Sequence, residues 1–540
     1  MSQETQEHTA PRARRKAEAT ELAQVARDEV RRHWTRLLGM GLYWAWLQVV
    51  FSSFIHAPGT PLGDNDPTMR QLVWLFSLGF TLATFAAAIL LRKHLPTSRD
   101  DSRNDGSRQV DARQVSTRWI GALSHAFMAV GTLLLVVGGQ LAGDGQAVTG
   151  NSFDSPLGDP QTLVVVCGAV LTGVGSGVAF LLWGGHLATL STQRVMFDMT
   201  AYAIQTALFT CVFFLLPNTV AGVCAIVLPC VAGVLLARSC ASSEQTEPAT
   251  PVPSELAGPA PTASPTPSPA PDARNPQTAR LVVLAVFVGL VFGLMRGLTA
   301  STSEATTLAT VVGIAISAVL LAVTAFACRR PSELYLTCQV SFPLLALGFL
   351  LLHVVKGETL PVIVFMAGHN YFYSLLWVFC AERAHARPGA AAPVFAGGLL
   401  AFLGSSFAGS LVGMVLNGSG VRSGQEIGAV SLVVLYLFIV ALAYLLGITR
   451  RNAEEEMSRR AQSFKLATAA IAQASGLSPR EEEVFHLIAL GKDRAETCAI
   501  LGIASDTVKA HTRHVYTKLG IHSKKDAAEL VARYPEDSSI

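Results

Sequence analysis

Apolar segments of about 20 residues recur along most of this chain, and each is long enough to cross a bilayer as a helix. The charged fraction is only 15%, against about 25% in ordinary soluble proteins. We therefore expect an all-α fold in which the lipid bilayer surrounds the region 37–448. About twelve segments meet this description, at residues 37–55, 71–91, 119–141, 163–183, 199–216, 220–237, 281–298, 308–327, 336–355, 360–381, 394–416 and 427–446.

A proline-rich stretch divides these segments into two sets of six. Residues 239–279 contain PATPVPSELAGPAPTASPTPSPAP, and proline at this density predicts an extended linker rather than a domain. The two halves then cover 37–238 and 280–448. This layout resembles the major facilitator superfamily, in which two six-helix bundles enclose a cavity near the middle of the membrane. The resemblance is one of layout only, because the loop after the second segment lacks that superfamily's G-x-x-x-D-R-x-G-R-R pattern.

The basic residues of the loops predict the orientation of the chain. Seven of them lie between the second and third segments, whereas the loop 143–160 has no Lys or Arg. The positive-inside rule then places the N-terminal segment 1–36 and the C-terminus in the cytoplasm. We therefore expect a multi-pass protein of the cytoplasmic membrane. The seven residues are Arg92, Lys93, Arg99, Arg103, Arg108, Arg113 and Arg118.

Residues 477–534 show a different pattern, which predicts four short helices joined by tight turns. Ser478 and Glu481 form the signature of a capping box at the start of the first helix, and Asp493 and Glu496 repeat it at the second. Glycine ends each of the first three helices, at Gly491, Gly502 and Gly520.

The third of these helices, over 507–519, has two unlike faces. Val508, Val515 and Leu519 fall close to one stripe at helical spacing, and cations occupy the remaining surface. A basic face suits the phosphates of DNA, and a short helix beyond a tight turn can enter the major groove. The alternative is a solvated, charged helix end. The cations are Lys509, Arg513 and Lys518.

These residues resemble the LuxR/FixJ-type helix-turn-helix domain. The matching stretches are LSPREEEVF at 477–485, Gly491, Glu496, TVKAH at 507–511 and KLGI at 518–521. The resemblance implies double-stranded DNA as partner and a homodimer formed through the fourth helix, with RNA polymerase as a further candidate partner. It also implies that three residues face base edges, Lys509, Ala510 and Arg513, and that four contact phosphates, Thr507, Lys518, Lys524 and Lys525.

Three residues depart from the family pattern in parts that support the domain. Ala504 stands where the family has the serine that caps the third helix, so Ser505 or Asp506 would have to cap it instead. Loss of a cap costs about 1 kcal/mol. Thr497 and Cys498 replace an apolar residue and an alanine in the second helix. None of these changes removes a predicted DNA contact.

The segment 449–476 is rich in alanine and charge, and it has no glycine or proline before Gly476. This composition predicts a helical connector between the membrane region and the DNA-binding domain. Two interpretations remain open. The connector either transmits a change in the membrane region, with or without self-association, or it is only a spacer.

Polar residues inside the apolar segments are candidates for a ligand site. His369, Asn370 and Tyr373 lie near the middle of the tenth segment and about one helical turn apart, so we predict that they bind a small-molecule ligand. The alternative is that they only pack. Three ionisable residues near segment ends are expected at the membrane interface: Asp198, Arg296 and Glu382.

Glycines spaced four residues apart predict close helix contacts rather than a gating role. They are Gly173 with Gly177, Gly289 with Gly293 and Gly297, and Gly409 with Gly413.

Several function classes have no support in the sequence. The nine cysteines include no C-x-x-C pair, so neither a disulfide framework nor a metal site is predicted. There is no H-E-x-x-H motif and no phosphate-binding loop, so we expect neither an enzyme nor a bound cofactor. No receiver domain precedes the DNA-binding domain, which argues against control by phosphorelay.

The leading hypothesis is a membrane-embedded one-component transcriptional regulator that senses a small molecule or a membrane signal. The alternative is a transporter, similar in layout to the major facilitator superfamily, that carries a regulatory DNA-binding domain. Uptake of an inducing compound that depends on His369 or Tyr373 would favour the transporter.

Overall fold

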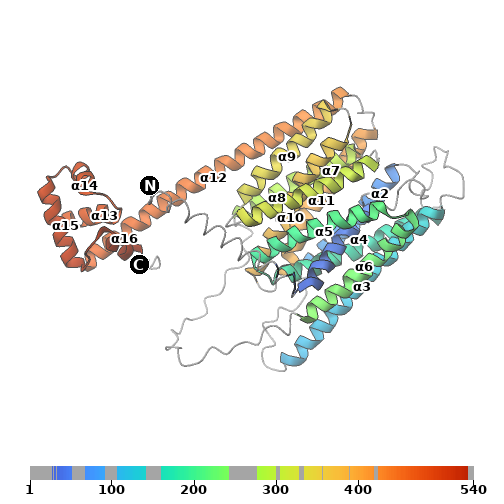
Figure 1. Ribbon diagram of the computed structural model, residues 1–540, viewed down its shortest axis with the longest axis horizontal. Helices are drawn as coiled ribbons and strands as arrows, with labels where there is room; N and C mark the ends of the chain where they lie inside the picture. The colour runs from blue at the N-terminus through green and yellow to red at the C-terminus, as the bar shows by residue number, and fades with distance from the viewer. Residues whose placement is uncertain are drawn as a thin grey trace, which may run out of the picture. The chain divides into compact units, whose positions relative to one another are not determined.

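The computed structural model describes residues 27, 30–31, 33–51, 67–91, 106–141, 160–242, 276–299, 304–327, 334–355, 357–387, 390–418 and 424–532 (Figure 1). Every regular element in these ranges is a helix, as the sequence predicted. The chain forms two compact units, Met1–Val440 and Ala441–Ile540. The proline-rich linker lies almost entirely outside the described residues.

The first unit begins with a helix at 33–51, which buries Met40, Tyr43 and Trp46 completely. The later helices are α2 (Pro67–Leu91), α3 (Gly106–Leu141), α4 (Pro160–Leu187), α5 (Thr192–Leu215), α6 (Asn218–Ser242), α7 (Pro276–Leu298), α8 (Glu304–Ala327), α9 (Leu334–Val354), α10 (Thr359–His385), α11 (Ala391–Gly418) and α12 (Gly424–Ala474).

Ten helices in the described ranges, α2 to α11, are long and apolar enough to cross a membrane. A shorter apolar stretch, Gly428–Ala441, belongs to α12. The helix at 33–51 is not among the ten, and most of its apolar residues are buried in the protein interior, although Trp34 is exposed. The all-α prediction is therefore confirmed, with ten clear spans where about twelve were expected.

The helices pack as two groups that meet along several contacts. In the first group α4 packs against α2 and α3, and α3 packs against α6. In the second group α7 packs against α11, and α10 against α8 and α9. The groups meet where α5 contacts α8 and where α2 contacts α11 (Figure 1).

Glycines bring α7 and α11 into backbone contact. A Cβ atom on Gly293 would lie 2.0 Å from the Ser406 carbonyl oxygen, and one on Gly297 would lie 2.7 Å from the Cα of Gly413. Ser410 Oγ donates to the Gly293 carbonyl at 3.1 Å. Small residues allow backbones to approach this closely. The helix contacts that the glycine spacing predicted are thus present.

Asp198 lies near the start of α5, but its carboxylate is inside the protein. It is 0% exposed and pairs with Arg36, which is 3% exposed, at 3.0 Å from Nε to Oδ2. Tyr202 donates to the same carboxylate at 3.4 Å. Each buried charge is therefore balanced by the other, as burial of charge in a protein requires.

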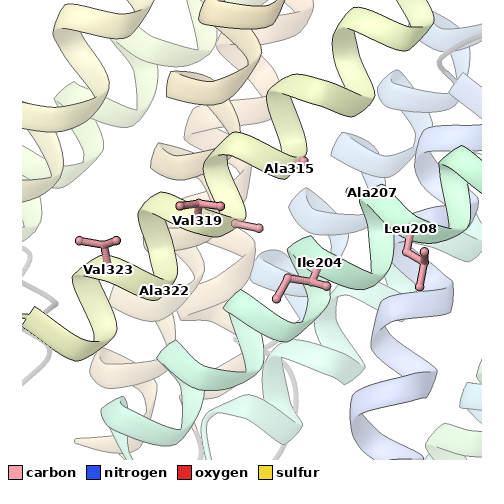
Figure 2. Close-up of a pocket in the computed structure, with 8 residues that line it drawn as sticks. Ile204, Ala207, Leu208, Ala315, Val319, Ala322 and Val323 are labelled. Atoms are coloured by element: carbon pink, nitrogen blue, oxygen red, sulfur yellow. The ribbon is translucent and has the colours of Figure 1, made fainter. Parts of the chain in front are cut away.

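An apolar groove of about 730 Å³ lies between α5 and α8, where the two groups of helices meet. Figure 2 shows carbon side chains from both helices around it, among them Ile204, Leu208, Val319 and Val323. The described residues that line the groove are all apolar, so this lining suits a hydrocarbon group rather than a polar ligand.

Two helices are longer than the sequence patterns indicated. α3 begins at Gly106 rather than near Trp119, so its first turns are polar. α12 is continuous from Gly424 to Ala474, so the last apolar segment and the predicted connector form one helix. Arg450 and Arg451 lie within this helix, and arginine is a good helix former.

Candidate DNA-binding surface

Four short helices follow α12 in the second unit, as predicted: α13 (Pro479–Ala489), α14 (Arg494–Leu501), α15 (Ser505–Leu519) and α16 (Lys524–Ala532) (Figure 1). Both predicted capping boxes are present, at Ser478 with Glu481 and at Asp493 with Glu496. Gly502 and Gly520 end α14 and α15 in the left-handed conformation, which glycine adopts without strain.

One apolar core joins α13, α15 and α16 to the end of α12. Val484 and Phe485 of α13 and Val515 of α15 are 0% exposed, and Ile471 of α12 belongs to the same cluster at 7%. Phe464 of α12 also packs against it. The last turns of α12, which fall in the predicted connector, are thus part of the folded C-terminal domain.

A polar contact reinforces this attachment of α12 to α13. Thr468 Oγ1 lies 3.0 Å from His486 Nδ1, and the His486 ring meets the Phe464 ring edge to face. Partial burial and the nearby Lys465 lower the pKa of His486, so the imidazole is neutral at neutral pH. A neutral ring can share a hydrogen bond with the threonine hydroxyl without a buried charge.

α15 presents one face to the core and the opposite face to solvent. Val508 is 2% exposed and Val515 is fully buried, whereas Lys509, Ala510 and Arg513 are all exposed. At 100° per residue Ala510 and Arg513 lie on the side opposite the two valines, and Lys509 lies at the edge of that side. The predicted base-reading residues therefore share a free surface. Thr517, one turn beyond Arg513, lies on the same face and was not predicted.

The N-terminus of α15 carries no cap in the described structure. Ala504 is the N-cap residue and no side chain accepts from the first amides, so the predicted capping by Ser505 or Asp506 does not occur. The first amides of a helix then remain free to donate, and the helix dipole favours an anion there. Thr507 is exposed in this first turn.

Lys518 is placed differently from the other cations of α15. Its ammonium lies 2.6 Å from Glu481 Oε2 and 3.0 Å from the Gly476 carbonyl oxygen. Glu481 also accepts from the Ser478 amide at 2.8 Å and lies 3.4 Å from His514. The Lys518 hydrogen bond and the Ser478 amide lower the pKa of Glu481 to about 2. Lys518 thus ties α15 to α13.

The two cations of α16 that were predicted to contact phosphates, Lys524 and Lys525, are both exposed in its first turn. Lys525 lies 3.9 Å from Glu529, a loose surface pair that leaves the ammonium available. Asp526 accepts from the His522 and Ser523 amides, each at 3.0 Å, and caps the helix. These amides, with the Ser523 hydroxyl, lower the pKa of Asp526.

Of the departures in α14, Thr497 has a structural role. It is 1% exposed and its hydroxyl donates to the Asp493 carbonyl oxygen at 2.7 Å, so its polar atom is satisfied in the interior.

The three predicted ligand residues of the first unit all lie on α10, but only His369 and Tyr373 are in contact with each other. The rings of His369 and Tyr373 stack with centroids 6.0 Å apart, and both contact Phe402 of α11. Asn370 does not join them, because its amide donates to the Met366 carbonyl of the same helix at 2.9 Å. Trp44 from the first group of helices packs 5.4 Å from Tyr373.

Comparison with known families identifies the C-terminal domain. The family model described as bacterial regulatory proteins, luxR family, matches residues 475–531. Transcriptional activator protein YukR of Yersinia ruckeri is 44% identical over 54 residues, which is 10% of this chain and 24% of YukR. HTH-type transcriptional activator RamA of Corynebacterium glutamicum is 38% identical over 63 residues, 12% of this chain and 22% of RamA. The matches thus span about a quarter of these relatives.

The helical bundle is similar to solved transporters. A bacterial homologue of the iron transporter ferroportin in the outward-facing state aligns with a TM-score of 0.47 and 12% identity over 78% of this chain and 99% of its own. The human organic anion transporter MFSD10 aligns with a TM-score of 0.49 and 13% identity. That alignment covers 77% of this chain and 99% of MFSD10.

Proposed function

The C-terminal domain of this chain belongs to the luxR family of bacterial regulatory proteins, and from that premise we propose that the protein is a membrane-embedded transcriptional regulator. It senses a small molecule or a membrane signal and changes transcription through this domain. One observation carries the proposal. The exposed face of α15, with Lys509 and Arg513, occurs in the same chain as helices that are long and apolar enough to cross a membrane, ten of them within the described residues.

Lys509, Ala510 and Arg513 read base edges in the major groove. Arginine and lysine pair with guanine, and a small alanine allows the helix to approach the bases. Thr507 holds a phosphate at the uncapped N-terminus of α15, where amides and the helix dipole favour an anion.

The remaining cations bind the DNA backbone. Lys524 and Lys525 contact phosphates from the exposed first turn of α16. Lys518 contributes less to phosphate binding, because its ammonium already forms an ion pair with Glu481. α16 also provides the surface through which two copies dimerise, and the bound dimer contacts RNA polymerase.

The protein resides in the cytoplasmic membrane with both termini in the cytoplasm, since only that side gives access to DNA. The basic loop after α2 supports this orientation. The signal binds two conformations of the bundle with different affinities. For a modest switch the two binding free energies differ by about 1–3 kcal/mol. His369 and Tyr373 contribute to the ligand site. Asn370 contributes least to ligand binding, because its side-chain amide already donates to the Met366 carbonyl of the same helix.

α12 transmits the change to the DNA-binding domain. It is one helix from the last apolar stretch to Ala474, and Ile471 lies in the core of the domain. A displacement of this helix therefore acts on the core directly.

The test is genome-wide mapping of the full-length protein crosslinked to DNA in cells. Lys509→Ala with Arg513→Ala should abolish discrete binding sites while the protein remains in the membrane. The matched control is Arg480→Ala with Lys492→Ala, which removes the same charge from two exposed ion pairs, to Glu483 and Glu496. The control should keep its sites. Loss of sites in both variants, or in neither, contradicts the proposed reading face.

Salt dependence gives a second, quantitative readout in vitro. Each phosphate contact that is removed should reduce the slope of log affinity against log salt concentration by about 0.9. Lys524→Gln and Lys525→Gln should each do so, with little change in sequence preference.

A further inference from the structure

Arg296 joins the two groups of helices within the first unit. It lies on α7, two residues before the end of that helix. Its Nη2 donates to the Phe51 carbonyl oxygen at 2.5 Å, at the end of the helix 33–51. Its Cζ lies 4.4 Å from the centroid of the Trp74 ring of α2. One guanidinium thus connects the second group to two helices of the first.

The charge of Arg296 is not balanced by an acid. Among the described residues no Asp or Glu forms an ion pair with it, and its buried Nε has no hydrogen-bond partner. Arg36, in the same unit, shows the usual arrangement, because Asp198 neutralises it at 3.0 Å. An unpaired cation inside a membrane-spanning protein is costly, and such residues mark sites that bind a counter-charge.

Aromatic rings lie near Arg296. Phe292 lies one turn earlier on the same face of α7, and its ring stacks on His369 of α10 with centroids 3.8 Å apart. His369 is 7% exposed, and its Nδ1 is buried without a hydrogen-bond partner. The Trp74 ring completes the aromatic surroundings. An unpaired cation, an unpaired imidazole nitrogen and aromatic rings therefore occur together.

We propose that Arg296 and His369 form a binding site for an aromatic carboxylate at the junction of the two groups of helices. A carboxylate matches the fork of a guanidinium, and an aromatic ring packs favourably beside the rings of Phe292 and Trp74. His369 Nδ1 supplies a further hydrogen bond to the ligand. The groove between α5 and α8 is less suited to this role, since the described residues that line it are all apolar.

Occupation of this site changes the link between the groups. Nη2 of Arg296 bonds the Phe51 carbonyl, so a carboxylate that draws the guanidinium toward itself competes with that bond. The binding claim stands on the geometry, and only its effect on transcription rests on the proposed function.

Benzoate, the smallest aromatic carboxylate, tests the site, and benzamide is its neutral counterpart of the same shape. Tryptophan emission of the purified full-length protein in detergent is followed during titration, because Trp74 lies against Arg296. Benzoate should bind at least about tenfold more tightly than benzamide, because the neutral benzamide lacks the charged contact with the guanidinium. Arg296→Gln should remove that difference, and His369→Phe, which keeps the ring stack, should reduce benzoate affinity several-fold.

Arg383→Gln is the matched control. Arg383 of α10 donates to Thr278 at the opposite end of α7, so it is another partly buried arginine that links α7 to a neighbouring helix. The Arg383→Gln variant should bind benzoate with the same affinity as the unchanged protein. Arg296→Lys keeps the charge and should retain part of the response, which separates loss of binding from loss of folding.

Equal affinity for benzoate and benzamide, or an unchanged benzoate response in Arg296→Gln, overturns the site. The titration contains no DNA, so its result is independent of the proposed regulatory function. Binding through Arg296 without any change of DNA occupancy in benzoate-treated cells supports the site and counts against the regulatory function.

Discussion

The Lys518 ammonium lies 2.6 Å from the Glu481 carboxylate, so an ion pair ties the recognition helix α15 to the start of α13. Glu481 is 5% exposed and also accepts from the Ser478 amide. This carboxylate therefore fixes two helix positions together, and Lys518 supports the orientation of α15.

Glu481→Gln should destabilise the DNA-binding domain by about 1–2 kcal/mol, because a charge-assisted hydrogen bond is lost while Lys518 stays partly solvated. Hydrogen exchange of α13 and α15 amides in the full-length protein measures this. The pKa of Glu481 is lowered from 4.5 to about 2, so its contribution is complete above pH 4.5 and is lost as pH falls towards 2. A difference between the two proteins that persists unchanged at pH 2 would contradict the assignment.

Ala504→Ser should stabilise α15 by about 1 kcal/mol, since a serine at the N-cap can accept from the free amides of the first turn. Slower exchange of the α15 amides would show it. Ala504→Gly, which adds no acceptor, is the control and should give at most a small part of the effect. The new serine also competes with a phosphate for those amides, so DNA affinity should not rise with stability.

Asp198→Ala should cost the membrane unit about 3–5 kcal/mol, because the buried Arg36 would lose the carboxylate that lies 3.0 Å from its Nε. The measurement is the thermal unfolding midpoint of the full-length protein in detergent. Arg36→Met combined with Asp198→Leu replaces the pair by apolar residues and should recover most of the loss. A double variant as unstable as the single one would show that the pair contributes more than charge balance.

The sequence predicted the features that local chemistry determines. The capping boxes at Ser478 and Asp493 each depend on residues three positions apart, and both are present. The glycines of α7 and α11 likewise signalled a close contact through their spacing alone.

Contacts between distant residues were not predictable in this way. Glu481 and Lys518 are 37 positions apart, and Arg36 and Asp198 are 162 apart, so no local pattern joins them. Arg296 was expected at the membrane interface because it lies near a segment end, and its contacts with Phe51 and the Trp74 ring depend on how helices pack. A single sequence reports periodicity along each helix, whereas these contacts depend on which helices become neighbours.

Ile471 of α12 provides the strongest test of how the domain is attached to the rest of the chain. It is 7% exposed in the core that α13, α15 and α16 share, so Ile471→Ala should destabilise the domain by about 2–4 kcal/mol. Leu466→Ala, a truncation on the same helix at a residue 64% exposed, should cost less than about 0.5 kcal/mol. Hydrogen exchange of α13 amides in the full-length protein gives both values. If α12 were only a spacer, the two variants would behave alike; a large loss confined to Ile471→Ala means that α12 is built into the domain it would move.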